Sequence, residues 1–185
     1  MKKLVIDTET TGLSPRFNKT LTVGMLLIEV NHEFLNLLDS NHLFIKHDFY
    51  NTDPAALKVN KINIEEHHKI ASPPRLVCQN INNFIQKNDL RETPIVGHNI
   101  TFDQGFLNAL FDQGKSNSIL STESIDTMHI WNSLKRKGYV PWSLRSNLQT
   151  VADYFRIDYT KAHDALADCH ITAKVYHEML KLLKS

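Results

Sequence analysis

The residues best suited to chemistry are acids that stand where apolar residues would be expected. In LVIDTETTGL, residues 4 to 13, an apolar run ends in Asp7 and Glu9. Side chains alternate across a strand, so both carboxylates point to the same face. Two carboxylates on one face repel, unless water covers them or a divalent cation lies between them. The pair therefore indicates either a solvated strand end or a cation site.

A third acid lies in PIVGHNITFDQGFLNAL, residues 94 to 110, where a short apolar strand leads into a helix. Asp103 falls on the apolar stripe of that helix, which continues as Phe106, Leu107 and Leu110. An ordinary first-turn Asp, favoured by the helix dipole, is the alternative to a functional carboxylate.

A fourth acid lies in AHDALADCHITAKVYHEML, residues 162 to 180. Asp168 is aligned with the packing face of this helix, which contains Ile171, Thr172 and Val175. A core Asp with satisfied hydrogen bonds is the alternative. His163 lies just upstream, at the expected start of the helix.

Acids that point inward from three separate segments indicate a shared site. Hard carboxylate oxygens, with few cysteines and no paired histidine ligands, favour Mg²⁺ or Mn²⁺ over zinc. Such sites most often perform phosphoryl chemistry. His67 and His68 are expected on the surface, because neighbouring positions give no metal-binding geometry.

Length and composition indicate one globular domain, residues 1–185, with 42% hydrophobic and 22% charged residues. The formal net charge is +1, from 21 Lys and Arg against 20 Asp and Glu. Attraction of a polyanion must therefore be local.

Cysteine content and the N-terminus favour a cytoplasmic protein without a membrane partner. Cys78 and Cys169 are too few for a disulfide framework. The apolar run at residues 4–6 is too short for a signal peptide or a membrane span.

The expected elements form an α/β protein, a mixed sheet with helices packed on it. Strands are predicted at residues 3–9, 20–30, 42–46 and 94–96. Helices are predicted at residues 54–60, 72–87, 101–113, 126–135, 146–155 and 164–184.

Three of these segments together resemble a known family. DTETTGL, HNITFDQGFL and HDALAD are similar, in order and spacing, to the motifs of the DnaQ-like (DEDDh) 3′-to-5′ exonucleases. The family includes proofreading epsilon-type exonuclease domains, oligoribonuclease and RNase T. The resemblance runs from Leu4 to about Leu180 and includes AALKVNKI and IDTMHI. His163 matches the His type; the Tyr type does not match, because Asp164 stands at its tyrosine position.

The resemblance implies a ribonuclease H-like fold, a five-stranded mixed β-sheet flanked by α-helices. Such a sheet needs a further short strand near residues 119–125, which the local pattern does not indicate.

The resemblance also implies roles for the acids. Asp7 would bridge two divalent cations, Mg²⁺ or Mn²⁺, while Glu9 and Asp168 would hold the ion on the nucleophile side. Asp103 would support the leaving-group side, through water. His163 would accept the proton of the attacking water, which its near-neutral pKa permits.

Further residues are implied to contact the 3′-terminal nucleotide. They are Thr8, Thr10, Thr11, Gly12, Leu13, His98, Asn99 and Phe102. Leu13 would pack against a base, or alternatively anchor the turn in the core. His98 is equally well explained as a buried histidine with satisfied hydrogen bonds.

The segment LKRKGYVPWSLRS, residues 134–146, combines basic residues with Tyr139 and Trp142. Positive charge with stacking surface is how single strands are held. A solvated loop with both aromatic rings tucked beneath it is the alternative.

The sequence therefore predicts a metal-dependent exonuclease that removes nucleoside 5′-monophosphates from single-stranded 3′ ends. DNA is favoured over RNA, because oligoribonuclease has Met at the position of Thr10. An exoribonuclease is the alternative, as is a non-catalytic nucleic-acid-binding subunit. The chain ends soon after its last helix, so we expect an enzyme that works without a polymerase.

Overall fold

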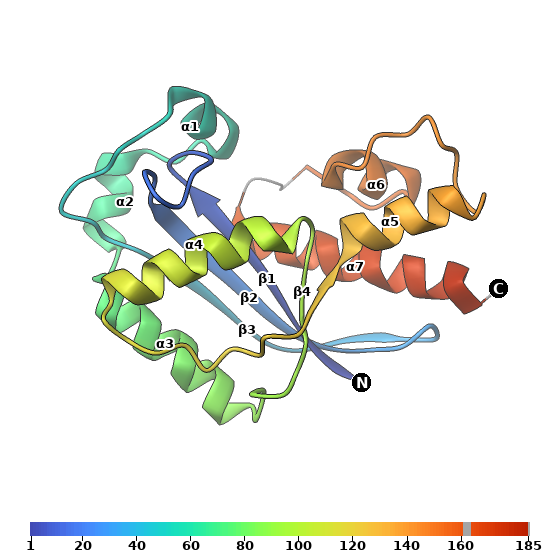
Figure 1. Ribbon diagram of the computed structural model, residues 1–185, viewed down its shortest axis with the longest axis horizontal. Coiled ribbons are helices and arrows are strands. Elements are labelled where there is room, and N and C mark those ends of the chain that lie inside the picture. Colours follow the sequence, from blue (N-terminus) through green and yellow to red (C-terminus); the bar gives the residue numbers. More distant parts are fainter. Residues whose placement is uncertain (161–163, 185) are drawn as a thin grey trace.

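The computed structural model describes residues 1–160 and 164–184 (Figure 1). In this part of the chain, five strands form one sheet in the order β3-β2-β1-β4-β5. They are β1 (Lys2–Thr10), β2 (Thr20–Val30), β3 (Leu35–Phe44), β4 (Ile95–Gly97) and β5 (Ser124–Asp126). The β1–β2 and β2–β3 pairs are antiparallel, whereas β1–β4 and β4–β5 are parallel. The predicted mixed sheet is confirmed, and β1 is its central strand.

Helices cover both faces of the sheet. They are α1 (Pro54–Asn60), α2 (Ile64–Ile70), α3 (Pro74–Lys87), α4 (Ile100–Gln113), α5 (Thr127–Arg136), α6 (Leu148–Tyr154) and α7 (Ala165–Lys184). Figure 1 shows α1 and α2 at one end of the molecule and α5 and α6 at the other. No helix in the described ranges is both long and apolar enough to cross a membrane.

Strand β1 divides its side chains between two cores. Leu4 and Ile6 pack with buried residues of α3 and α4. Val5, on the opposite face, packs with Cys169 and Ala173 of α7. The period-two alternation of a strand therefore fixes which later side chains of β1 approach which helix.

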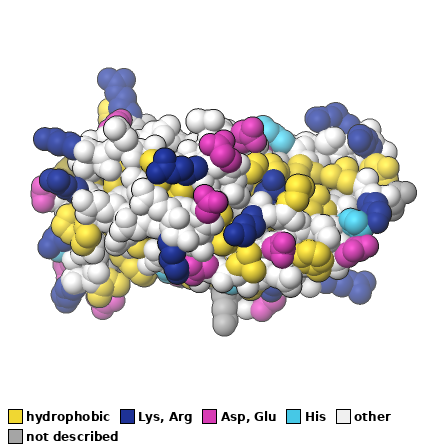
Figure 2. Space-filling model, turned by 90° about the horizontal axis from the view of Figure 1, so that it is seen from below, with side chains coloured by type: hydrophobic (Ala, Val, Ile, Leu, Met, Phe, Trp, Pro, Cys, Tyr) yellow, Lys and Arg dark blue, Asp and Glu magenta, His cyan; other side chains and the backbone are white. Residues whose placement is uncertain are grey.

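Neither sign of charge is concentrated on the face of the molecule that Figure 2 shows. Lys and Arg side chains are interspersed there with Asp and Glu. This distribution agrees with the net charge of +1.

Two elements differ from the sequence-based expectations. Strand β3 starts at Leu35, not at residue 42, and most of its first half is exposed. Pairing with β2 holds this exposed edge strand, whose own sequence gives little strand signal because it contains Asn and Asp and lacks β-branched residues. Helix α2 was not predicted; it is a short polar helix whose cap is Asn63, which accepts hydrogen bonds from Glu65 N and Glu66 N. The further strand implied near residues 119–125 is confirmed as β5.

Gly24 lets helix α7 begin directly on the sheet. It lies opposite Asp7 in the β1–β2 register. A Cβ atom at this position would overlap the backbone of Ala165, the first residue of α7. A side chain here would therefore lift the start of α7 away from β1.

Gly24→Ala should lower the free energy of unfolding by about 1–3 kcal/mol, because the added methyl group has no space beside the backbone of α7. Urea denaturation measures the change. Gly105→Ala is the matched control: its Cβ would meet nothing closer than Pro15 Cγ at 3.4 Å. In helix α4 that change should add about 0.5–1 kcal/mol. Equal effects of both substitutions would contradict the tight contact at Gly24.

Candidate active site

Three carboxylates converge where β1 ends beside the first turn of α7. Oxygen atoms of Asp7, Glu9 and Asp168 all lie within 4.8 Å of one another. Asp7 and Glu9 lie on the face of β1 that carries Val5, and this face packs against α7. The alternation of β1 and the position of Asp168 in the first turn of α7 together build the cluster.

Burial and mutual repulsion make these carboxylates hard to ionise. The pKa of Asp7 is raised well above its ordinary range, mainly by burial and then by the charges of Asp103 and Asp168. Burial raises the pKa of Glu9 to about 8, and the charge of Asp168 adds to this rise, whereas a hydrogen bond from Asn60 opposes it. A divalent cation among the three would offset the repulsion.

Asp103 stands next to this cluster and is fixed by Thr8. The Asp103 side chain is 4% exposed and lies in the first turn of α4. Its Oδ1 accepts hydrogen bonds from Thr8 N at 2.9 Å and from Thr8 Oγ1 at 2.7 Å. Burial raises the pKa of Asp103 to about 7, although both bonds from Thr8 act in the opposite direction.

Thr8 has a role that the sequence reasoning missed. It was expected to contact substrate, but it is buried and donates both bonds to Asp103. Since it lies between Asp7 and Glu9 on β1, its side chain points to the opposite face, toward α4. The same alternation that paired the two acids was the signal that could have placed Thr8.

The donor set suits a hard divalent cation. Each of the three clustered residues offers a carboxylate oxygen, and neither cysteine belongs to the group. Mg²⁺ and Mn²⁺ prefer such oxygen ligands. The raised pKa values of Asp7 and Glu9 agree with this assignment, because ions would stabilise their charged forms.

His163 lies outside the described residues, so its expected role stays a prediction. The described chain resumes at Asp164, whose side chain accepts a hydrogen bond from Ala167 N at 3.0 Å. Its backbone oxygen accepts from Asp168 N at 2.8 Å. Asp164 therefore begins the turn that carries Asp168 to the cluster.

The turn after β1 is held by its own threonines. Thr10 Oγ1 donates to Gly12 O at 2.7 Å, and Asn60 Nδ2 donates to Thr10 O at 3.0 Å. Thr11 is fully buried, and its hydroxyl oxygen accepts from Lys19 N at 2.8 Å. The hydroxyl and backbone groups of Thr11 are thus used inside the turn, and its expected contact with substrate stays a prediction.

Leu13 projects from this turn into solvent. Its side chain is 78% exposed. The alternative that Leu13 anchors the turn in the core is therefore wrong. The side chain is therefore available for contact with a ligand.

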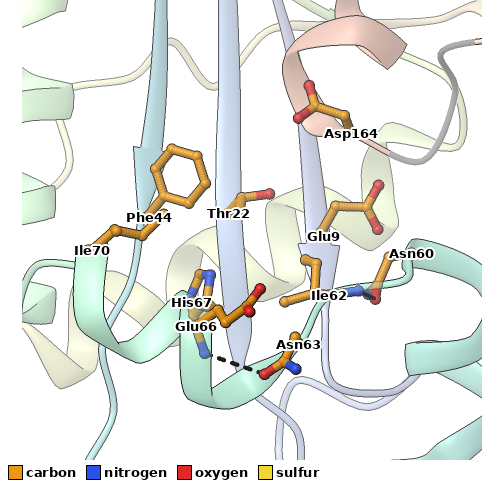
Figure 3. A pocket seen from close by; sticks show the side chains of 10 residues that line it. All are labelled: Glu9, Thr22, Phe44, Asn60, Ile62, Asn63, Glu66, His67, Ile70 and Asp164. Carbon is orange, nitrogen blue, oxygen red and sulfur yellow. Dashed lines mark hydrogen bonds between the residues drawn. The ribbon is translucent and has the colours of Figure 1, made fainter.

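A cavity of about 330 Å³ opens beside Glu9 (Figure 3). One side is formed by the sheet and the start of α7, and the other by α2 and the segment before it. Its lining residues are Glu9, Thr22, Phe44, Asn60, Ile62, Asn63, Glu66, His67, Ile70 and Asp164.

His67 is a correction to the sequence-based expectation, which placed it on the surface. It is 5% exposed, and its Nε2 donates to Ile45 O at 3.0 Å. Burial lowers the pKa of His67. Its place in unpredicted helix α2 explains the error.

The turn between β4 and α4 and the first turn of α4 contain the other expected substrate contacts. His98 Nε2 donates to Ser146 O at 2.7 Å, and His98 Nδ1 lies 2.9 Å from Thr127 Oγ1. This favours the alternative of a histidine satisfied within the protein. Asn99 is exposed, with a left-handed φ of 69°, and its N–H donates to Asp126 Oδ1. Phe102 is partly exposed and packs against Phe106.

Sequence comparison places relatives over almost the whole chain. Ribonuclease T of Histophilus somni is 26% identical over 189 residues, covering 98% of this chain and 84% of that protein. A PolC-type DNA polymerase III of Streptococcus mutans is 27% identical over 184 residues. That match covers 98% of this chain but only 11% of the polymerase.

Solved structures show the same fold. E. coli exonuclease I in complex with a dT13 oligonucleotide has a TM-score of 0.78 at 20% identity, covering 100% of this chain and 41% of that one. The nuclease domain of 3′hExo, a DEDDh family member bound to rAMP, has a TM-score of 0.78 at 16% identity. That match covers 97% of this chain and 92% of the other. The ribonuclease H-like fold is thereby confirmed.

Family membership follows from the extent of the match. Residues 4–176 match the RNase_T family of exonucleases. This span includes the carboxylate cluster, Asp103 and the turn after β1. The chain therefore belongs to the RNase_T exonuclease family, of the DnaQ-like type.

Proposed function

We propose that the protein is a metal-dependent exonuclease that removes nucleoside 5′-monophosphates from the 3′ ends of single strands, with DNA preferred to RNA. The observation that carries this proposal is the cluster of Asp7, Glu9 and Asp168, with Asp103 beside it. Two Mg²⁺ or Mn²⁺ ions, when bound, supply the charge that activates water and stabilises the departing 3′ oxygen.

Each carboxylate has a distinct part in this chemistry. Asp7 would be shared between the ions, because it lies close to both Asp168 and Asp103. Glu9 and Asp168 would hold the ion on the side of the attacking water. Asp103 Oδ1 is engaged by Thr8, and its Oδ2 takes part in neither of those bonds. That oxygen is suited to orient a water molecule on the leaving-group side.

His163 accepts the proton of the attacking water in this proposal. Its support is the sequence motif and its position one residue before Asp164, where the turn into the cluster starts. A neutral imidazole suits this task near pH 7.

The cavity beside Glu9 receives the terminal nucleoside. Glu9 of the carboxylate cluster lines this cavity together with the apolar side chains of Phe44 and Ile62. The side-chain N–H groups of Asn63 are offered to a sugar or a base, since its oxygen caps α2. Exposed Leu13 stands on the turn at the end of β1 and packs against the nucleotide.

Exoribonuclease activity is the second candidate. It is favoured by the relative named ribonuclease T, of which this chain covers 84%. The DNA proposal draws on Thr10 and on the PolC-type relative, of which the chain spans only about a tenth.

A reducing compartment such as the cytoplasm agrees with two buried free cysteines.

A single strand labelled at its 5′ end should shorten stepwise from its 3′ end when Mg²⁺ or Mn²⁺ is present. Gel analysis of matched DNA and RNA strands, single and double, measures polarity and preference together. Chelator should stop the reaction, because the carboxylates alone leave the departing oxygen unstabilised. Mainly internal cuts would disprove the exonuclease proposal, and the same degradation in chelator would disprove the metal requirement. Binding without any cleavage would identify a non-catalytic subunit.

Asp7→Asn should abolish cleavage, because a neutral amide does not bridge two divalent ions. The metal-free variant should stay folded and be at least as stable as the wild type, since one repelling charge is removed. Cleavage assays and urea denaturation measure the two effects. Asp112→Asn, at an exposed position of α4, is the control and should change neither. Failure of the Asp7 variant to fold would make Asp7 a structural residue.

The metal-free protein should lose stability as pH rises from about 5 to about 8. The pKa of Glu9 is about 8 in the folded protein against an ordinary value of 4.5. Between these values the folded state holds a proton that the unfolded chain has released, so rising pH favours unfolding. Urea midpoints in chelator should show this slope, and Glu9→Gln should flatten it. Mg²⁺ should reduce the loss by binding the ionised folded state. A midpoint that rises over this interval would contradict the assignment.

A further inference from the structure

A long stretch of the chain next to the site carries only positive charge. Residues 127–152 contain no Asp or Glu, although the whole chain has 20 of them. Four cationic residues lie in this stretch: Lys135, Arg136, Lys137 and Arg145. In a protein with a net charge of +1, this is the kind of local concentration that a polyanion would recognise.

Two aromatic rings of this stretch face solvent. Trp142 is 72% exposed and Tyr139 is 45% exposed. The alternative that both rings are tucked under the loop is therefore wrong. By contrast, the other tryptophan, Trp131, is fully buried. Exposed aromatic rings among cationic side chains offer stacking surfaces to unpaired bases.

The segment that connects α5 to α6, residues 137–147, is fixed to the fold at both ends. Trp131 Nε1 donates to Arg145 O at 3.1 Å. Lys135 Nζ donates to Ser146 Oγ at 3.1 Å and also to Leu144 O. Val140, which lies between Tyr139 and Trp142 in the sequence, is buried. A surface held in this way loses little conformational entropy on binding.

The same segment is bonded to the turn that precedes α4. His98 Nε2 donates to Ser146 O at 2.7 Å. His98 lies in the turn that opens α4, and α4 carries Asp103. In Figure 1 the segment joining α5 and α6 projects beyond the two helices, which pack beside α7. A strand whose 3′ end lies at the carboxylates would reach this surface by extending toward the end of the molecule that contains α5 and α6.

We propose that Arg136, Lys137, Tyr139, Trp142 and Arg145 form a surface that binds the single strand on the 5′ side of the terminal nucleotide. The cationic groups contact phosphates, and Trp142 stacks on a base. Single strands fit this surface better than duplexes, because duplex bases are already stacked on one another. The inference rests on the proposed function and names where the rest of its substrate lies.

Tryptophan fluorescence tests binding without cleavage. In the Asp7→Asn variant with Mg²⁺, a deoxythymidine strand of about 15 nucleotides should quench the exposed Trp142, whereas thymidine 5′-monophosphate should not. The quenching should disappear in Asp7→Asn/Trp142→Ala, because the remaining Trp131 is buried. Equal quenching in both variants, or none in the first, would overturn the proposal.

Kinetics with long and short substrates separate strand binding from catalysis. Trp142→Ala should raise KM for the long strand by about tenfold or more, with kcat nearly unchanged. Hydrolysis of the p-nitrophenyl ester of thymidine 5′-monophosphate should be unaffected, because this ester occupies the terminal position alone. Phe34→Ala, at an exposed aromatic in the β2–β3 turn, is the control and should change neither. Loss of both activities in Trp142→Ala would show a structural role and overturn the proposal.

Salt dependence tests the cationic part and also serves if Trp142→Ala does not fold. Arg136→Ser/Lys137→Ser should reduce the slope of log KM against log salt by about 1.4, because each phosphate that is no longer neutralised lowers it by roughly 0.7. Arg75→Ser/Arg91→Ser, at exposed positions elsewhere, should leave the slope unchanged. An unchanged slope in the first pair would overturn the proposal.

The two proposals fail in different ways. If the wild type cleaves neither DNA nor RNA but the strand still quenches Trp142, the proposed function is wrong and the binding surface stands. If cleavage is normal and the Trp142 variant keeps wild-type KM for the long strand, the surface is wrong and the function stands.

Discussion

Repulsion between buried carboxylates is the constraint on which the rest of this structure depends. Repulsion favours separation of the side chains of Asp7, Glu9 and Asp168, and burial raises the energetic cost of ionising them. They are kept together because β1 is the central strand, paired on both sides. Gly24 lets α7 begin directly against the sheet. The fold thus holds the carboxylates in a geometry that lowers stability unless bound protons or cations reduce their repulsion.

The alternation of β1 distributes the site over two helices. Asp7 and Glu9 face α7, where they meet Asp168, whereas Thr8 faces α4 and holds Asp103. One strand end therefore positions acids from three separate segments. Because Thr8 fixes Asp103 through two bonds to a single oxygen, Asp103 is oriented even without a cation.

The acids were predictable because they interrupt apolar patterns whose period is known. Residues whose positions are fixed by tertiary contacts were not predictable from the sequence. Helix α2 has seven mostly polar residues and is held by its cap and by buried His67. No local hydrophobic pattern therefore predicts it. The exposed first half of β3 depends on β2 for its pairing. Thr11 looks like a free hydroxyl in sequence, but the turn that buries it is closed by Lys19, eight positions away.

An acidic site has to draw in an acidic substrate, and the charge distribution suggests how the two tasks are divided. The carboxylates alone would repel phosphates, so attraction at the site depends on the ions they hold. The chain as a whole gives no help, since its net charge is only +1. Positive charge is gathered instead in the acid-free residues 127–152. Ser146 of this stretch accepts a hydrogen bond from His98, in the turn before the helix that carries Asp103. In the proposed arrangement, strand capture is separated from cleavage, so the site can keep the clustered negative charge that bound cations would require.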